Sequence, residues 1–431
     1  MFENLKITDF DNGARVVSCE MPNARTAAVS LAVRGSFRAE TPETAGWTIV
    51  CGDLTRKGTK HHRDSVALDG WKSERGIRDE LGYSPYWTVF GKNSPVRTFG
   101  DAIGIFRDEI LNPLFAEKEL EKEVADLALA RKQNEESLGY LVDTAVRSAC
   151  FGKDWNGLTV YGTEASMAGV TREKLLAHQR RMFAAKGAVL FVAGPFGHDK
   201  AVQYVEKMVR QLPVEEPFKS VPLNMPAVPE PLSVVRRPAS EARLNLYFLK
   251  KGGDLAAEKI PAGKILFNIL SDGMGSRLFR NVRNCRGLAY SVSASALSDP
   301  EYFGASLSGS FSPERLEEAV SCSVRELRKM AEARVSSAEL GAAKELLIGR
   351  EKLSGQTPRS VAVNRLGDFM KYGSIPTTKE FSDGIRAVTA EDVRALAEEL
   401  FLSSQPVLAL GLPEKGGDPE RALAAMRREL A

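Results

Sequence analysis

Histidine and cysteine are scarce in this sequence, and neither is arranged as a metal-binding motif. The 431 residues include four histidines and five cysteines. The cysteines, odd in number and widely scattered, are Cys19, Cys51, Cys150, Cys285 and Cys322. Because no CxxC pair is present, the sequence gives no sign of a cysteine-based zinc site or of a disulfide framework. We expect five reduced and mostly buried thiols.

An excess of charge of one sign is also missing. The chain has 59 basic and 56 acidic residues, and its formal net charge is +3. This balance gives no reason to expect a nucleic acid or an anionic membrane surface as a partner.

Long apolar runs are absent as well. No uninterrupted apolar stretch is long enough to span a bilayer, so we expect no membrane insertion. Residues 1–9 contain no apolar segment typical of a signal peptide. A cytoplasmic location is therefore the default expectation, and a processed precursor is the open alternative.

Prolines, by contrast, are concentrated in one region. Those between residues 213 and 240 are Pro213, Pro217, Pro222, Pro226, Pro229, Pro231 and Pro238. Prolines at this density interrupt helices and central strands, so the region is expected to be an extended linker. The chain is also too long for one ordinary core. We therefore expect an N-terminal domain at residues 1–212, a linker at 213–240 and a C-terminal domain at 241–431.

The two halves contain an internal repeat. In the first half, Thr171 is expected to cap a helix that is followed by an apolar strand at residues 189–193. In the second half, Thr389 stands before a similar helix, which is followed by an apolar strand at residues 407–410. Because the same order recurs at one spacing, duplication of a domain is the better interpretation.

Each half combines alternating apolar strands with amphipathic helices. Residues 27–33 and 244–249 are typical of strands, and residues 120–132 and 313–334 are typical of helices. The pattern predicts an α+β protein with two homologous domains, each a mostly antiparallel sheet with helices packed on one face.

Four segments, taken in order, resemble the pitrilysin/insulinase family of metallopeptidases, in particular the mitochondrial-processing-peptidase type. They are the opening strand at residues 12–17, residues 46–60, the Asn-Pro-Leu-Phe turn at residues 112–115, and the run at residues 273–292. The resemblance spans nearly the whole chain. It implies that the two domains together form one half of a metallohydrolase-like clamshell.

The zinc site of that family is an HxxEH motif on a helix, completed by a Glu one long helix downstream. In this sequence the HxxEH positions hold Ile49, Gly52 and Asp53, and the downstream position holds Ala130. Ile, Gly and Ala side chains offer no lone pair, and one carboxylate does not hold zinc at useful affinity. The resemblance therefore implies a degenerate zinc site, and we expect no metal or cofactor in this chain.

A second group of family residues is retained. Family members carry an Arg and a Tyr seven residues apart across the cleft from the zinc, and the matching residues are Arg283 and Tyr290. Their side chains can donate hydrogen bonds to a peptide carbonyl and to the oxyanion of a tetrahedral intermediate. Taken alone, they are equally typical of a surface charge and an aromatic residue at the edge of a core.

Two glycines are weaker candidates for substrate binding. Gly273 and Gly275 precede a helix. They would either let a peptide backbone approach closely or form a turn with positive φ.

Residues 83–90 correspond to an edge strand to which substrates of this family add as an extra strand. Pro85 has no backbone N–H, so it argues against strand addition here. The aromatic residues of this segment are expected to be core or partner contacts.

The loss of the metal positions beside a retained Arg/Tyr pair predicts a non-zinc subunit of a heterodimeric zinc metalloendopeptidase. A homologous partner would supply the zinc, and the substrates would be extended peptides. The alternative is an inactive scaffolding subunit, similar to the core subunits of the respiratory cytochrome reductase. A homodimer also stays open, and the chain alone is not expected to hydrolyse peptides.

Overall fold

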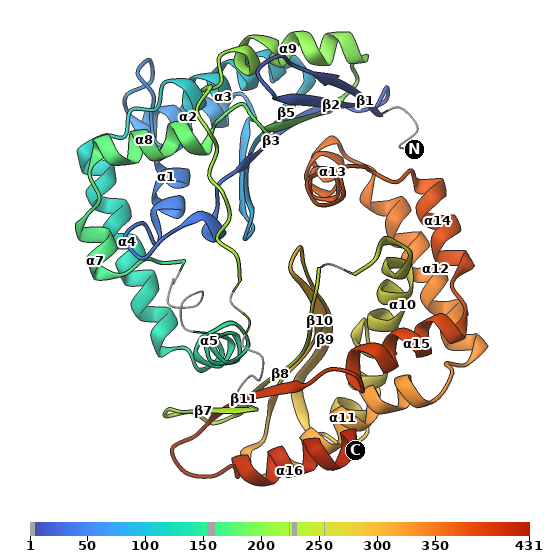
Figure 1. The fold of residues 1–431 in the computed structure, drawn as a ribbon. Helices are drawn as coiled ribbons and strands as arrows, with labels where there is room; N and C mark the ends of the chain where they lie inside the picture. Colours follow the sequence, from blue (N-terminus) through green and yellow to red (C-terminus); the bar gives the residue numbers. More distant parts are fainter. Residues whose placement is uncertain (1–4, 153–159, 224, 226–230, 254) are drawn as a thin grey trace. The chain divides into compact units, whose positions relative to one another are not determined.

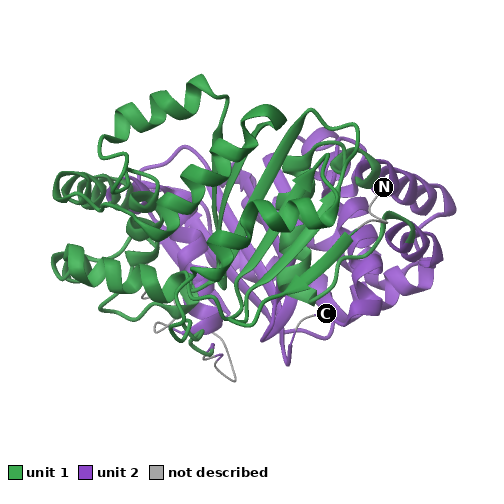
Figure 2. Ribbon diagram, turned by 90° about the horizontal axis from the view of Figure 1, so that it is seen from above, with its two compact units in different colours: residues 1–131, 158–222, 351–379 green, residues 132–157, 223–350, 380–431 purple. Residues whose placement is uncertain are grey.

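The computed structural model describes residues 5–152, 160–223, 225, 231–253 and 255–431. The chain divides into two compact units, each assembled from three segments (Figure 2). Unit 1 contains residues 1–131, 158–222 and 351–379, and unit 2 contains residues 132–157, 223–350 and 380–431.

A six-stranded sheet forms the centre of unit 1 (Figure 1). Its strands are β1 (Leu5–Asp9), β2 (Arg15–Glu20), β3 (Thr26–Arg34), β4 (Arg78–Tyr83), β5 (Trp87–Pro95) and β6 (Val189–Gly194). They lie in the order β1-β2-β6-β3-β5-β4. Only β2 and β6 run parallel, and the other neighbours are antiparallel. The apolar side chains of β3 and β6 point alternately to both faces of the sheet, and both strands are almost fully buried.

Helices cover one face of this sheet. They are α1 (Trp47–Thr55), α2 (Ser65–Glu74), α3 (Phe99–Leu111), α4 (Glu117–Glu136), α7 (Glu164–Ala168), α8 (Arg172–Met182) and α9 (His198–Arg210), with short turns η1 (Phe37–Ala39) and η2 (Val96–Thr98). Their apolar side chains and those of β2, β3, β5 and β6 form one core.

Unit 2 repeats this plan with five strands. They are β7 (Leu232–Arg236), β8 (Ala242–Lys251), β9 (Ala289–Asp299), β10 (Tyr302–Phe311) and β11 (Pro406–Leu412), in the order β7-β11-β8-β10-β9. Only β7 and β11 run parallel.

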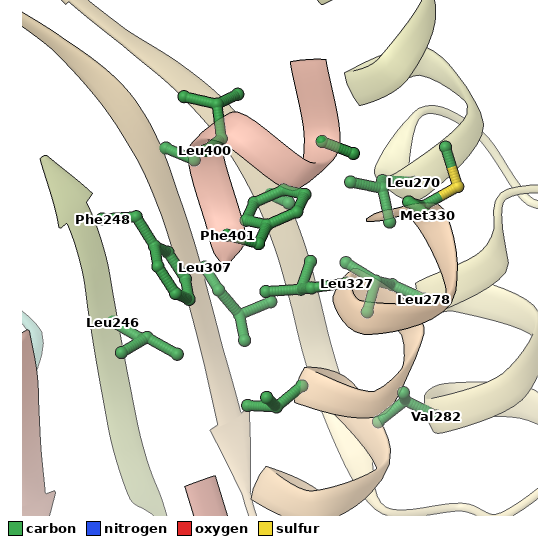
Figure 3. Close-up of a cluster of buried hydrophobic side chains, with 14 of the residues drawn as sticks. Leu246, Phe248, Leu270, Leu278, Val282, Leu307, Leu327, Met330, Leu400 and Phe401 are labelled. Carbon is green, nitrogen blue, oxygen red and sulfur yellow. The ribbon is translucent and has the colours of Figure 1, made fainter. Parts of the chain in front are cut away.

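The core of unit 2 lies between this sheet and a helical layer. The helices are α10 (Ile260–Ser271), α11 (Leu316–Glu332), α12 (Ser337–Ser354), α14 (Thr378–Ala387), α15 (Ala390–Phe401) and α16 (Pro419–Leu430), with η3 (Ala257–Lys259), η4 (Phe279–Asn284) and η5 (Pro313–Arg315). Figure 3 shows Phe248 of β8 and Leu307 of β10 beside Leu327 of α11 and Phe401 of α15. The rings of Phe248 and Phe401 meet edge to face, with centroids 5.4 Å apart.

The repeat expected from the sequence appears in both the strand order and the helix caps. The order β2-β6-β3-β5-β4 in unit 1 corresponds to β7-β11-β8-β10-β9 in unit 2. Thr171 caps α8 by accepting a hydrogen bond from the backbone N–H of Lys174 (3.3 Å). Thr389 caps α15 in the same way, accepting from Asp392 (3.1 Å). The α+β fold with two homologous halves is therefore confirmed.

The second face of each sheet also carries a helix, which the sequence analysis did not predict. Helix α13 (Pro358–Tyr372) packs on β3 and β6 of unit 1, and α5 (Leu138–Phe151) packs on β8 and β11 of unit 2. On β3, Val29 and Leu31 face the first helical layer, whereas Ala28 and Ala32 face α13. Each of these two helices comes from the half of the sequence that builds the other sheet.

The compact units therefore do not follow a single division of the chain at residues 213–240. Residues 213–222 belong to unit 1, and unit 2 resumes at residue 223. Within the expected linker, Leu232–Arg236 form strand β7, while residues 224 and 226–230 lie outside the described residues.

Among the described helices, none is both long and apolar enough to cross a membrane.

Candidate functional site

Helix α1 carries the three positions that the resemblance assigns to the HxxEH motif, two for zinc ligands and one for the water-activating glutamate. The helix begins after Gly46, and the side chain of Glu40, six residues earlier in the sequence, caps its first backbone N–H groups. The buried carboxylate of Glu40 accepts hydrogen bonds from the backbone N–H groups of Gly46 (3.0 Å) and Thr48 (2.8 Å). Burial raises the pKa of Glu40 to about 7, although both hydrogen bonds favour the ionised form.

The space beside Gly52 on α1 is filled by Tyr83. A Cβ atom at Gly52 would lie 2.4 Å from Tyr83 Oη and 3.1 Å from Cζ. The Tyr83 hydroxyl donates to the backbone carbonyl of Ile49 (3.3 Å), and its ring lies 5.7 Å from that of Phe37. Burial, and next the negative charge of Asp53, raises the pKa of Tyr83, so its hydroxyl stays protonated. Tyr83 thus reaches from the end of β4 onto α1.

The other two positions offer little to a metal ion. Asp53 Oδ1 lies 2.6 Å from the guanidinium of Arg56, one turn further along the same helix. Ala130 stands on α4 and has only a methyl group. Two turns before Ala130, Glu123 pairs with Lys57.

This set of donors does not fit zinc. A catalytic zinc ion takes three protein ligands, whereas these four positions provide one carboxylate, which is already paired with an arginine. No group of three or more His, Cys, Asp or Glu side chains placed to hold a metal occurs in the parts of the chain that the structure describes.

Strand β4 forms the free edge of the sheet in unit 1 and pairs only with β5. Pro85 lies in the hairpin between these two strands, where the backbone N–H of Ser84 donates to the carbonyl of Trp87 (2.9 Å). The expectation that Pro85 removes a donor from the edge strand is therefore wrong, because the proline occupies the turn. Phe90, from the same segment, is a core residue as expected, packed on Phe183 at 4.8 Å.

Arg283 and Tyr290 lie together in unit 2, where strand β9 begins. The guanidinium carbon of Arg283 is 4.8 Å from the ring centroid of Phe279 and 5.8 Å from that of Tyr290. Tyr290 is 80% exposed, and Arg283 is exposed as well. Stacking on two rings restricts the arginine while its charge stays in solvent. The structure thus brings together the two residues that the sequence analysis paired.

A tight connection from η4 to β9 fixes the spacing of this pair. Gly287 has φ of 57°, and its N–H donates to the carbonyl of Arg283 (3.0 Å). The next residue, Leu288, is buried, and its N–H donates to the carbonyl of Val282 (3.1 Å). Only glycine adopts this left-handed backbone without strain, so Gly287 allows the turn.

The two candidate glycines, Gly273 and Gly275, have similarly open surroundings but differ in backbone conformation. Gly273 has φ of 82°, and its carbonyl accepts a hydrogen bond from the Ser276 hydroxyl (2.8 Å). A Cβ atom at Gly273 or Gly275 would meet nothing within 4 Å. Positive φ therefore accounts for Gly273, and the open space beside both glycines is compatible with the close approach of another backbone.

Ion pairs on both sides hold this glycine loop against α12. Arg277 makes two hydrogen bonds to Glu339 (2.9 and 3.0 Å), and these lower the pKa of Glu339 to about 2. On the other side, Arg350 pairs with Asp272. The loop between them presents Met274, which is 75% exposed.

A buried charge network in unit 1 was missed by the sequence analysis. Lys92 on β5 and Glu109 on α3 are each 1% exposed and lie 2.5 Å apart. Lys72 on α2 lies 3.1 Å from Glu109 and 2.8 Å from Asp79 on β4. Burial opposes the charge of Lys72, but the two carboxylates outweigh it and raise its pKa. One signal in the sequence could have revealed the network. Lys92 follows Phe90 by two residues, so both side chains lie on the same, apolar face of strand β5.

Solved structures share this fold over nearly the whole chain. A peptidase M16 inactive domain from Pseudomonas fluorescens superposes with a TM-score of 0.85 at 19% identity, covering 96% of this chain and 100% of that one. A protease from Helicobacter pylori superposes with a TM-score of 0.83 at 17% identity, with the same coverage. These likenesses define the class of fold.

The sequence matches then define the family. Residues 15–164 match the insulinase family (peptidase family M16), and residues 169–347 match the peptidase M16 inactive domain. The chain belongs to the M16 peptidase family.

Curated relatives match over more than nine tenths of their length. The uncharacterized zinc protease YmxG of Bacillus subtilis is 25% identical, over 90% of this chain and 94% of that protein. An uncharacterized zinc protease of Streptomyces coelicolor is 26% identical, over 96% of this chain and 91% of that protein. This chain is thus homologous to M16 zinc proteases.

Proposed function

We propose that this chain is the non-zinc subunit of a heterodimeric zinc metalloendopeptidase. In this assembly a homologous partner holds the zinc, and Arg283 and Tyr290 act on a peptide bound at the partner's site. The observation that carries the proposal is the exposed Arg283 stacked near the rings of Phe279 and Tyr290, in a chain whose own assigned metal positions offer only the paired carboxylate of Asp53.

The chemistry of the pair suits a peptide carbonyl. The guanidinium is always charged and donates in a fixed plane, so it orients the carbonyl of an extended peptide. The Tyr290 hydroxyl donates to the oxygen as negative charge develops on it. The zinc of the partner would supply the activated water, and neither of these two residues can replace that role.

Support for a shaped site also comes from the rigidity of its surroundings. Gly287 and the buried Leu288 fix the turn between the two residues. The Arg277–Glu339 pair braces the neighbouring glycine loop. When catalytic groups are already held in place before the substrate binds, less free energy is needed to order and reorient them in the transition state.

The test mixes the purified chain with a zinc-bearing M16 homologue that co-purifies with it, and measures cleavage of an unstructured peptide. We expect Arg283→Ala and Tyr290→Phe each to lower kcat by about 10²- to 10³-fold, the usual cost of one oxyanion donor. Arg280→Ala is the matched control, because Arg280 is an exposed arginine of the same turn.

Assembly must be measured on the same samples by analytical ultracentrifugation. Loss of cleavage with intact heterodimer supports the proposed role. Full cleavage by both variants would refute it and would favour the scaffolding alternative, in which the chain contributes only packing.

A further inference from the structure

Gly52 lies in the middle of α1, where glycine is unfavourable. Its backbone is helical, and φ is not positive there. Glycine in a helix interior costs about 1 kcal/mol relative to alanine, because the unfolded chain loses more conformational freedom. No requirement of the helix itself therefore explains this residue.

Tyr83 provides the explanation. A methyl group at position 52 would lie 2.4 Å from the Tyr83 hydroxyl oxygen, 3.1 Å from Cζ and 3.2 Å from Cε1. The first distance is too short for non-bonded atoms and the other two are tight, so alanine at this position requires the tyrosine to move.

The tyrosine is not free to swing aside without cost. Its hydroxyl donates to the carbonyl of Ile49, and its ring packs near Phe37. Its backbone is also fixed, because Tyr83 is the last residue of β4 and is in register with Thr88 of β5. A displaced ring would lose these contacts and leave a void beside α1.

We infer that Tyr83 and Gly52 are a matched pair that closes the position of the water-activating glutamate, so that restoring the HxxEH motif meets a steric block. A glutamate at position 52 begins with the Cβ atom that Tyr83 excludes. The side chain that would face a metal-bound water therefore has no room to leave the helix. Tyr83 is a blocking residue in this sense, and it acts by occupying space. The inference rests on the proposed function and deepens it, because a chain with no room for this glutamate needs another chain to activate the attacking water.

The first test uses the sign of a stability change. In the wild-type background, Gly52→Ala should lower the Tm despite the better helix propensity of alanine. In a Tyr83→Ala background, the same substitution should raise the Tm, because only the propensity gain remains. Tyr83→Phe is the matched control: it removes the hydroxyl but keeps Cζ and Cε1, so Gly52→Ala should still lower the Tm. A rise in Tm in all three backgrounds would overturn the pairing.

The second test places the glutamate itself at this position in the isolated full chain. Gly52→Glu should lower the Tm in the wild-type background and lower it much less in the Tyr83→Ala background. Circular dichroism is recorded on all of these proteins to verify folding. An equal loss of Tm in the two backgrounds would overturn the inference.

This outcome is separable from that of the proposed function. Tm is measured without a partner, whereas the role of Arg283 and Tyr290 is measured by cleavage with one. Either claim can therefore fail while the other stands.

Discussion

The two units are copies of one fold that use polar side chains in opposite ways. Unit 1 buries Lys72, Lys92 and Glu109 behind its edge strands. In the described residues of unit 2, the buried polar side chains are mainly hydroxyls, with no lysine or arginine among them, and Arg283 is presented to solvent. Because strand order is the same in both, the backbone does not decide where charge is placed. The fold provides equivalent positions, and the side chains at those positions decide what each unit can do.

The contrast between the buried charges of unit 1 and those of unit 2 is tested most strongly by replacing Lys92. Lys92→Met should lower the free energy of unfolding by about 3–5 kcal/mol, because Glu109 and Asp79 would be left buried without this cation. Urea denaturation followed by circular dichroism measures the change. Lys6→Met, at an exposed position of β1, is the control and should change stability little. If both variants behave alike, unit 1 does not depend on its buried charges and the contrast with unit 2 disappears.

Helices α13 and α5 each pack on the sheet built by the other half of the sequence, so they test whether the two sheets depend equally on such a helix. Leu366 of α13 is fully buried on the sheet of unit 1. Leu366→Ala should lower the free energy of unfolding by about 2–5 kcal/mol, whereas Val363→Ala, on a more exposed part of the same helix, should have a small effect. Val146→Ala in α5 makes the corresponding change in unit 2, with a smaller side chain. If Leu366→Ala or Val146→Ala leaves the free energy of unfolding unchanged, the sheet of that unit does not depend on the helix from the other half of the sequence.

His178 gives unit 1 a dependence on pH that its counterpart helix in unit 2 should lack. Burial between Trp47 and Phe218, and next the charge of Arg181, lowers the pKa of His178 to about 4 from an ordinary 6.5. The unfolded chain therefore binds a proton at a pH where the native chain does not. Stability should fall as the pH falls from about 6.5 to about 4, by up to about 3 kcal/mol. Urea denaturation between pH 4 and 7 measures this slope, and His178→Phe should flatten it. An unchanged slope would assign the pH dependence to other groups.

Glu40 should act in the opposite direction. Its raised pKa, about 7, means that the native chain holds a proton that the unfolded chain releases above pH 4.5. Its contribution to stability therefore decreases as the pH rises from about 4.5 to about 7. Glu40→Gln removes this term, so the stability of that variant should rise more steeply with pH in this range than that of the wild type.

The smallest effect is expected at Glu339 of unit 2. The carboxylate is partly exposed, so solvent screens its pair with Arg277. Glu339→Gln should lower the free energy of unfolding by about 1 kcal/mol or less, yet it should loosen the glycine loop. Proteolysis near Met274 is the sensitive measurement. Unchanged cleavage there would show that the ion pair does not brace the loop.

The sequence alone determined the repeat, the type of the few strands and helices with a clear pattern, and the scarcity of metal donors at the positions assigned by resemblance. Thr171 and Thr389 were identified as caps because capping depends on residues three positions apart. The absence of ligands at Ile49, Gly52 and Ala130 needed no structure, because these side chains have no donor atom in any fold. The pairing of Arg283 with Tyr290 followed from a local motif, and its geometry is set by a short turn.

Only the tertiary structure decided which helix covers which sheet, and what fills the space beside Gly52. The contacts of α13 with β3 join residues more than three hundred positions apart, and periodicity within a segment carries no record of such partners. Tyr83 and the other aromatic residues of its segment were expected to be core or partner contacts, and Pro85 was expected to lie in the edge strand. For Lys92 the sequence analysis made no prediction. Their surroundings come from the packing of separate elements, so the chemistry of each side chain is known from the sequence, whereas its neighbours are known only from the fold.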